Sequence, residues 1–312
     1  MKKNLWLSLI LFCTLIFLAS CQSEENENVQ KAGENEENPS LTIGVMPAVD
    51  AAPIFLAEEK GYFEELGLDV TIQIYTNAMN RQSALQAGDI DGTITDLIAL
   101  VNNVANGFDM KVTTTTDGSF PFLVHTDFKE GEKENLKVGM MEVSVTNFLA
   151  DQYLGNRYKL EKVYINEIPA RLEMITKGTI DMAVIPEPMA SQGELNGLKK
   201  WLPEVNSDQS PDVMVFTGNA IKNKESSLRL FHEAYNKAVE DILIDDSEAR
   251  ELLIKKLNLD PSIQENMVLP VYHKTRIPTE EYIKEIIDWN ENVLREKVDV
   301  KYEQLIDGRF IQ

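Results

Sequence analysis

Hydrophobic and polar positions alternate along much of the chain, and short apolar runs are bounded by turn residues. Alternation of this kind is typical of β-strands, and the intervening three-to-four-residue periodicity is typical of amphipathic helices. The pattern predicts strands at Leu41–Met46, Leu68–Tyr75, Gly92–Thr95, Lys111–Thr115, Phe122–Thr126, Lys137–Met141, Lys162–Asn166, Met182–Ile185 and Val213–Thr217. It predicts helices at Ala52–Lys60, Asn80–Ala87, Leu97–Asn106, Thr146–Gly155 and Pro169–Lys177.

Strand and helix alternate with short connections as far as Thr217, which predicts an α/β fold with mostly parallel sheets. Beyond this point the pattern is helical only. Helices are expected at Ser226–Ile244, Ser247–Lys256, Pro261–Met267 and Thr279–Glu296. Because no strands separate these helices, we expect the C-terminal block to pack on an existing lobe.

The first twenty residues have the order of a secretion signal. Lys2 and Lys3 precede an apolar run from Leu5 to Leu18, and Leu18-Ala19-Ser20-Cys21 follows. The run is too short to cross a hydrocarbon core of about 30 Å comfortably, so a signal peptide over residues 1–20 is favoured over a membrane helix. The last four residues resemble the lipobox of bacterial lipoproteins, which implies cleavage before Cys21 and lipid attached to it.

The segment 22–39 contains six Glu and four Asn with almost nothing apolar, so residues 21–40 are expected to form a flexible tether. Cys13 and Cys21 are the only cysteines in the sequence. After cleavage and lipidation, no thiol remains for a disulfide, a metal ion or catalysis, and we expect neither a metal nor a cofactor. The formal charge of −21 argues against nucleic acid as a partner and favours a soluble monomer.

An internal repeat relates two stretches about ninety residues apart. The segment 85–96 ends a helix, passes Gly88 and Ile90-Asp91, and enters a strand that ends on Asp96. The segment 175–187 repeats this order and ends on Glu187. Because open parallel sheets bind ligands beyond the carboxyl ends of their strands, two such units suggest two similar lobes that face one another. A coincidence between two ordinary helix–turn–strand units is the alternative.

Several motifs resemble one family in both order and spacing. They are Leu41-Thr42-Ile43-Gly44-Val45-Met46-Pro47, Ala52-Pro53-Ile54-Phe55-Leu56-Ala57, Gly61-Tyr62-Phe63-Glu64-Glu65-Leu66-Gly67-Leu68, Ala84–Asp91 and Glu187-Pro188. Together they resemble ABC-transporter solute-binding proteins for nitrate, sulfonates, taurine and thiamine pyrimidine precursors, over essentially all of residues 41–312.

The resemblance implies a type II periplasmic-binding-protein fold, in which two lobes are joined by two crossing strands and hold the ligand between them. It places one lobe at residues 41–117 plus 216–312 and the other at 118–215. The crossings are expected at Ser119–Val124 and Asp212–Phe216. The implied protein is a lipoprotein on the outer face of the bacterial cell membrane, which delivers a small organic solute to an ABC permease.

Both lobes must contribute contacts, because a ligand shifts the open–closed balance only through its preference for the closed form. The expected binding residues are Pro47, Asp50, Asn77, Asp96, Ser144, Thr146 and Glu187. Most have an alternative structural role. A cap of the following helix is the alternative for Asp50, Asp96, Ser144 and Thr146, and a turn is the alternative for Asn77. Glu187, between Pro186 and Pro188, has no evident capping role and is the preferred candidate.

Basic residues are scarce near these loops. Arg81 is the one such residue, and it is expected inside a helix. An anion would ordinarily require Arg or Lys, whereas three candidate carboxylates suit a ligand with amine or amidine donors, such as an aminopyrimidine thiamine precursor. An alkanesulfonate, taurine or nitrate is the alternative ligand, since helix starts alone can hold anions.

Two other classes of protein remain open. A ligand-sensing lipoprotein without transport would have the same sequence features. An enzyme is less favoured, because no His-Glu-x-x-His, Gly-x-Ser-x-Gly or Ser-x-x-Lys pattern has supporting context, and His125, His232 and His273 are isolated.

Overall fold

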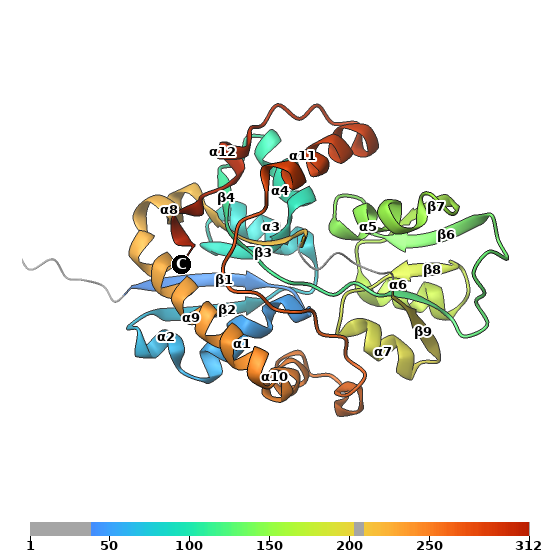
Figure 1. The fold of residues 1–312 in the computed structure, drawn as a ribbon, viewed down its shortest axis with the longest axis horizontal. Helices are drawn as coiled ribbons and strands as arrows, with labels where there is room; N and C mark the ends of the chain where they lie inside the picture. Colours follow the sequence, from blue (N-terminus) through green and yellow to red (C-terminus); the bar gives the residue numbers. More distant parts are fainter. Residues whose placement is uncertain (1–38, 203–208, 312) are drawn as a thin grey trace, which may run out of the picture. The chain divides into compact units, whose positions relative to one another are not determined.

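The computed structural model describes residues 39–202 and 209–311. The predicted signal peptide, Cys21 and nearly all of the tether therefore lie outside the described residues. Two five-stranded sheets organise the rest, each with helices around it (Figure 1). We call the sheet that contains the N-terminal strand, with its helices, the first lobe, and the other sheet with its helices the second lobe.

The first sheet has the strand order β2-β1-β3-β10-β4, in which β10 runs antiparallel to both of its neighbours. The second sheet has the order β7-β6-β8-β5-β9, and here β5 is the antiparallel strand. In each sheet the antiparallel strand is the first one after the chain arrives from the other sheet. The strands of the first sheet are β1 (Ser40–Val45), β2 (Asp69–Ile74), β3 (Gly92–Asp96), β4 (Met110–Thr115) and β10 (Asp212–Thr217). Those of the second are β5 (Phe122–His125), β6 (Asn135–Met140), β7 (Lys159–Tyr164), β8 (Met182–Val184) and β9 (Leu198–Trp201).

Helices link the strands within each lobe. The first lobe has α1 (Ala52–Glu59), α2 (Tyr62–Glu65), α3 (Ala78–Ala87) and α4 (Leu97–Ala105), and the second has α5 (Val145–Leu154), α6 (Ile168–Thr176) and α7 (Met189–Leu195). After β10 come α8 (Gly218–Asn223), α9 (Glu225–Ile244), α10 (Ser247–Leu257), α11 (Glu280–Trp289) and α12 (Tyr302–Leu305). Short 3-10 turns lie at Val49–Ala51, Pro261–Ile263 and Gly308–Phe310, and a π-helical turn follows α11 at Asn290–Leu294.

The C-terminal helices pack on the first lobe, as expected. Phe231 and Tyr235 of α9 and Leu253 of α10 are buried in one apolar cluster with Ile43 of β1 and Phe55 of α1. Helix α11 lies on the other side of the same sheet and buries Ile283 and Ile286 beside α4 (Figure 1). The α/β two-lobed prediction is therefore confirmed.

Individual elements differ from the predictions in several places, and the short helices α2, α8 and α12 are among those that were not predicted. Helix α7 and strand β9 were not predicted. Both are short, and Gly193 and Gly197 interrupt the pattern of apolar residues in the segment that forms them. The expected helix Pro261–Met267 is wrong, since only a 3-10 turn forms at Pro261–Ile263. The expected helix Thr279–Glu296 remains α-helical only as far as Trp289.

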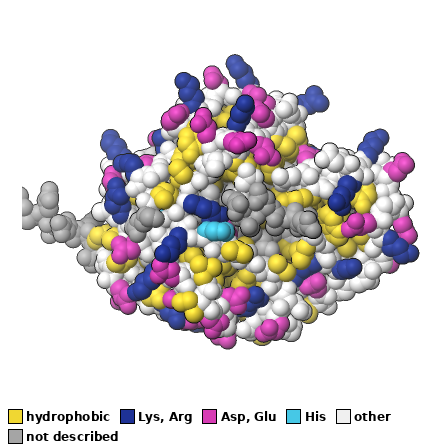
Figure 2. All heavy atoms as spheres, viewed as in Figure 1, with side chains coloured by type: hydrophobic (Ala, Val, Ile, Leu, Met, Phe, Trp, Pro, Cys, Tyr) yellow, Lys and Arg dark blue, Asp and Glu magenta, His cyan; other side chains and the backbone are white. Residues whose placement is uncertain are grey.

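Charged side chains of both signs are interspersed over the face of the molecule shown in Figure 2. Across the residues that the structure describes, no helix combines the length and the apolar character that a membrane span requires. In the same residues no cluster of His, Cys, Asp and Glu side chains has the arrangement of a metal site.

Candidate binding cavity between the two lobes

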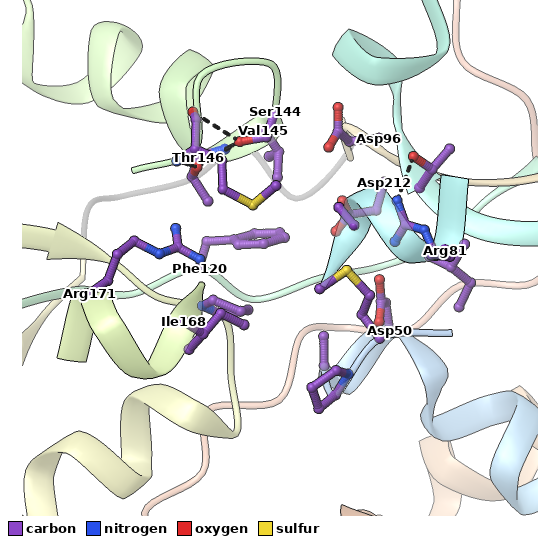
Figure 3. A pocket seen from close by; sticks show the side chains of 18 residues that line it. Asp50, Arg81, Asp96, Phe120, Ser144, Val145, Thr146, Ile168, Arg171 and Asp212 are labelled. Atoms are coloured by element: carbon purple, nitrogen blue, oxygen red, sulfur yellow. Dashed lines mark hydrogen bonds between the residues drawn. The ribbon is translucent and has the colours of Figure 1, made fainter. Parts of the chain in front are cut away.

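A cavity of about 70 Å³ lies between the two lobes, at the carboxyl ends of their parallel strands (Figure 3). Its volume corresponds to a handful of water molecules, since one needs roughly 10–15 Å³ on this measure. From the first lobe it is lined by Met46, Pro47, Ala48, Asp50, Ala78, Arg81, Ile94, Thr95, Asp96 and Asp212. Phe120, Met141, Ser144, Val145, Thr146, Ile168, Arg171 and Pro186 complete the lining from the crossing segment and the second lobe.

The wall of the first lobe carries three carboxyl groups around one guanidinium. Arg81 donates from Nη2 to the hydroxyl of Thr95 over 3.0 Å, and Asp50, Asp96 and Asp212 are near enough to favour its charged form. Burial acts the other way and lowers the pKa of Arg81 overall. Asp50 Oδ1, Asp212 Oδ2 and Arg81 Nε have no hydrogen-bond partner among the described residues. Unsatisfied buried groups of this kind are costly, which makes this wall a candidate for recognition of a ligand.

Burial is the main cause of the pKa shifts of these acids. It raises the pKa of Asp50 to about 7, and the charge of Arg81 opposes this shift. It also raises the pKa of Asp212 well above its usual range, and the neighbouring carboxylates of Asp50 and Asp96 add to the effect. Burial therefore favours the neutral, protonated form of both acids.

Asp96 has a structural partner as well as a place in the cavity. It is the N-cap of α4, and its Oδ1 accepts from the backbone N–H of Ala99 at 2.8 Å. Burial raises its pKa, while backbone N–H groups of Ala99 and of Val145, at the start of α5, lower it. Asp96 thus lies where a helix start in each lobe can stabilise its negative charge.

The wall of the second lobe is formed by the start of α5 and by Arg171. Ser144 is the N-cap of α5, and its hydroxyl accepts from the N–H of Thr146 at 3.1 Å. Arg171 of α6 is only 1% exposed and donates from Nη1 to the carbonyl of Val184 over 3.0 Å. Its Nε has no partner in the described part of the chain, and burial lowers its pKa to about 10. This wall therefore offers hydrogen-bond donors, whereas that of the first lobe is rich in acceptors.

Of the residues predicted for binding, the structure brings five together around the cavity: Pro47, Asp50, Asp96, Ser144 and Thr146. Asn77 lies beside the cavity at the N-cap of α3, where its Oδ1 accepts from the N–H of Asn80 and its Nδ2 donates to Glu167.

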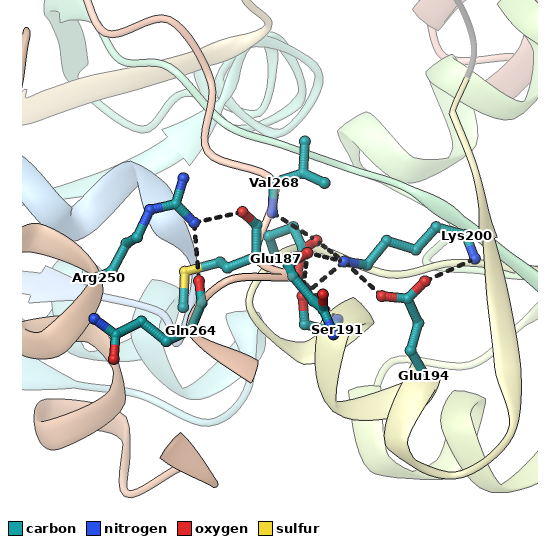
Figure 4. A network of polar contacts seen from close by, with 9 residues as sticks. Glu187, Ser191, Glu194, Lys200, Arg250, Gln264 and Val268 are labelled. Atoms are coloured by element: carbon teal, nitrogen blue, oxygen red, sulfur yellow. Dashed lines mark hydrogen bonds and ion pairs between the residues drawn. The ribbon is translucent and has the colours of Figure 1, made fainter. Parts of the chain in front are cut away.

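Glu187 does not line the cavity, and the expectation that it lacks a structural role is wrong. Its carboxylate is fully buried and forms an ion pair with Lys200 Nζ at 2.7 Å (Figure 4). It also accepts hydrogen bonds from the N–H and hydroxyl of Ser191 and from the N–H of Val268. These contacts join the second lobe to the segment that follows α10.

The expectation that Arg81 is the one basic residue near these loops is also wrong, because Arg171 lines the cavity as well. Arg171 was missed, although the internal repeat extends to it. Arg81 and Arg171 are ninety residues apart, as are Gly88 and Gly178. Each arginine is the fourth residue of its helix, and each helix precedes the corresponding central strand. Extending the repeat by about one helical turn toward the N-terminus would have identified the pair.

Each sheet contains one antiparallel strand that arrives from the other lobe, and the cavity lies between the two sheets, which together define the type II periplasmic-binding-protein fold. Residues 34–252 match the model of the NMT1-like family, and the chain belongs to this family. No curated protein matches the sequence.

Solved structures of similar fold share about one residue in seven with this chain. The ligand-binding component of an ABC-type import system from Staphylococcus aureus has a TM-score of 0.73 at 15% identity, covering 87% of this chain and 97% of its own. The alkanesulfonate-binding protein from Xanthomonas axonopodis pv. citri has a TM-score of 0.72 at 15% identity, with coverage of 86% and 98%. The nitrate-binding protein from Synechocystis PCC 6803 has a TM-score of 0.68 at 12% identity, with coverage of 86% and 84%.

Proposed function

We propose that this protein is the solute-binding component of an ABC importer, which captures a small organic solute between its two lobes. The observation that carries the proposal is the cavity, to which both lobes contribute buried polar groups. Asp50 and Asp212 of one wall and Arg171 of the other each have an atom without a hydrogen-bond partner among the described residues. A solute that satisfies both walls binds only when the lobes are together, which is the requirement for capture.

The proposed solute has different chemistry at its two ends. The acid-rich wall around Asp50 suits a protonated amine or an amidine. The opposite wall, with Arg171 and the start of α5, suits an anionic or accepting oxygen or a ring nitrogen. An aminopyrimidine of the thiamine-precursor type remains our preferred ligand, because it presents donors and acceptors on one small ring. Arg171 strengthens the case for the alternative, an amino-substituted alkanesulfonate such as taurine.

The small volume supports movement of the lobes. A cavity of about 70 Å³ is smaller than the several hundred Å³ of typical small-molecule sites. A solute with the size of an aminopyrimidine therefore requires the cleft to widen before it enters. In the proposed arrangement, residues 41–117 and 216–312 move as one lobe and residues 118–215 as the other.

The membrane attachment is proposed from the sequence alone. Cleavage before Cys21 and lipid on its thiol would hold the protein, as a monomer, on the outer face of the cell membrane, and residues 21–40 would let it reach its permease. Mass spectrometry of the protein from its native membrane tests this directly. A mature N-terminus other than a lipidated Cys21 would contradict it.

Two experiments test the binding function. Mass spectrometry of small molecules released from the purified protein should identify a solute with both an amine-type donor and an accepting group. Calorimetry should then show binding of an aminopyrimidine that Asp50→Asn weakens. Tight binding of a simple alkanesulfonate, with none of the aminopyrimidine, would reject the preferred ligand. Loss of uptake on deletion of the gene, with the permease intact, separates transport from sensing.

A further inference from the structure

One side-chain contact joins the two lobes beside the cavity without lining it. Asn77 Nδ2 of the first lobe donates to Glu167 Oε1 of the second over 3.0 Å. Asn77 is the N-cap of α3 and Glu167 is the N-cap of α6. The residues that follow them, Ala78 and Ile168, line the cavity. The contact therefore lies at the rim, where the starts of the two corresponding helices approach each other.

A second contact accompanies it. Asn166 Nδ2 lies 3.7 Å from the sulfur of Met79, which is 65% exposed. Two neighbouring residues of the second lobe, Asn166 and Glu167, thus contact the start of α3 in the first lobe, and both contacts exist only while the lobes are together. The side chain of Glu167 makes no cap hydrogen bond to its own helix, so its carboxylate is available to the other lobe.

We propose that Asn77 and Glu167 are positioning residues, which hold the lobes together at the rim and thereby set how tightly a solute is retained. This inference rests on the proposed capture of a solute between the lobes. A contact that is present in the closed form and absent from the open form contributes its whole free energy to closure. An exposed bond to a carboxylate is modest in strength, so the expected shift of the closure equilibrium is several-fold.

Asn77→Asp tests the contact with little change to the helix. Aspartate caps a helix start as well as asparagine, so α3 keeps its cap. The new carboxylate faces that of Glu167 and repels it. We expect the ligand-free protein to scatter X-rays with a larger radius of gyration than the wild type at low ionic strength, and the increase to diminish in high salt.

The rescue variant is Asn77→Asp with Glu167→Lys, which replaces the repulsion by an attraction between opposite charges across the same gap. Its radius of gyration should return to that of the wild type. Glu233→Lys is the matched control, because it makes the same charge change on an exposed position of α9 away from the cleft. It should neither alter the wild-type scattering nor rescue Asn77→Asp.

The outcomes separate this inference from the proposed function. If Asn77→Asp scatters as the wild type does, or if Glu233→Lys rescues it as well as Glu167→Lys, the positioning role is rejected. Neither result bears on whether a solute binds, which the released small molecule decides. Where that molecule is identified, its dissociation from Asn77→Asp should be several-fold faster, and Asn77→Asp with Glu167→Lys should restore the slower rate.

Discussion

Two stretches of the chain, 77–96 in the first lobe and 167–187 in the second, have the same backbone design. Gly88 and Gly178 end the helix with φ of 79° and 68°. The carboxylates of Asp91 and Asp181 then each accept from a backbone N–H of the neighbouring strand over 2.8 Å, from Thr42 and Lys137. The shared design brings Arg81 and Arg171 to opposite walls of one cavity.

The two stretches differ at their last acid. Asp96 stays in the cavity and caps α4, whereas Glu187 is buried against Lys200 of β9. The backbone design therefore delivers an acid to the end of each central strand, and the partners around that acid decide whether it can meet a ligand.

Lys200→Met should lower the free energy of unfolding by about 3–5 kcal/mol, because it leaves the buried carboxylate of Glu187 without its cation. Unfolding in urea at pH 7 measures the change. Glu187→Gln in the same background should recover much of the loss, since the charge is then removed as well. Lys199→Met, at the exposed neighbouring position, is the control and should have little effect. Equal stability of Lys200→Met and wild type would mean that Lys200 does not determine the role of Glu187.

Arg171→Met should weaken binding of the co-purifying solute by roughly 10- to 100-fold, the range expected when a charged hydrogen bond is lost. It should not lower stability much, since the main charge acting on Arg171 is the exposed Glu167. Arg81→Met should weaken binding and also destabilise the free protein, because three buried acids lose their cation. Calorimetry and urea unfolding separate the two effects. The same loss of stability in both variants would contradict the asymmetry of the walls.

Gly44→Ala and Gly139→Ala compare the same packing contact in each lobe. An added Cβ would lie 2.6 Å from Ile90 Cδ1 at Gly44 and 2.6 Å from Ile180 Cδ1 at Gly139. Overpacking of this kind costs about 1–3 kcal/mol. Gly44→Ala should cost more, because Thr93 and Tyr75 also crowd its Cβ at 3.2 and 3.3 Å. Urea unfolding measures the difference. Ile90→Val and Ile180→Val in the corresponding backgrounds should each recover part of the loss.

Local patterns in the sequence were sufficient to predict most of the fold. Alternation of apolar residues identified nine of the strands, and the internal repeat indicated two equivalent lobes. Residues at the ends of strands and the starts of helices, such as Asp50 and Ser144, could be assigned to the cleft because the carboxyl ends of parallel strands share an edge.

What could not be predicted depends on contacts between distant segments. Glu187 resembled a ligand contact because its partner Lys200 lies on β9, a strand that the sequence did not reveal. Asp212 was treated only as part of a crossing strand, and its place beside Asp50 follows from the insertion of β10 between β3 and β4. Arg171 was within reach of the sequence, through its spacing from Arg81.

The dependence of stability on pH distinguishes the cavity from the core of the same lobe. His232 is fully buried between the carbonyl of Leu228 and the hydroxyl of Thr113, and burial lowers its pKa to about 4. The unfolded chain, where the pKa of histidine is near 6.5, therefore binds more protons between pH 4 and pH 6.5. His232 alone makes the free energy of unfolding decrease as the pH falls through this window.

Asp50 acts in the opposite direction. Its pKa is about 7 in the folded protein and near 3.8 in the unfolded chain, so here the folded state binds the extra proton, and stability decreases as the pH rises through this range. In the wild type the two contributions oppose each other between about pH 4 and pH 6.5. Asp50→Asn removes one of them, and its free energy of unfolding should rise with pH more steeply than that of the wild type. His232→Gln should give the reverse change. Urea midpoints at several pH values measure both slopes, and a slope that Asp50→Asn leaves unchanged would show that Asp50 is ionised in the folded protein as it is in the unfolded chain, before any solute arrives.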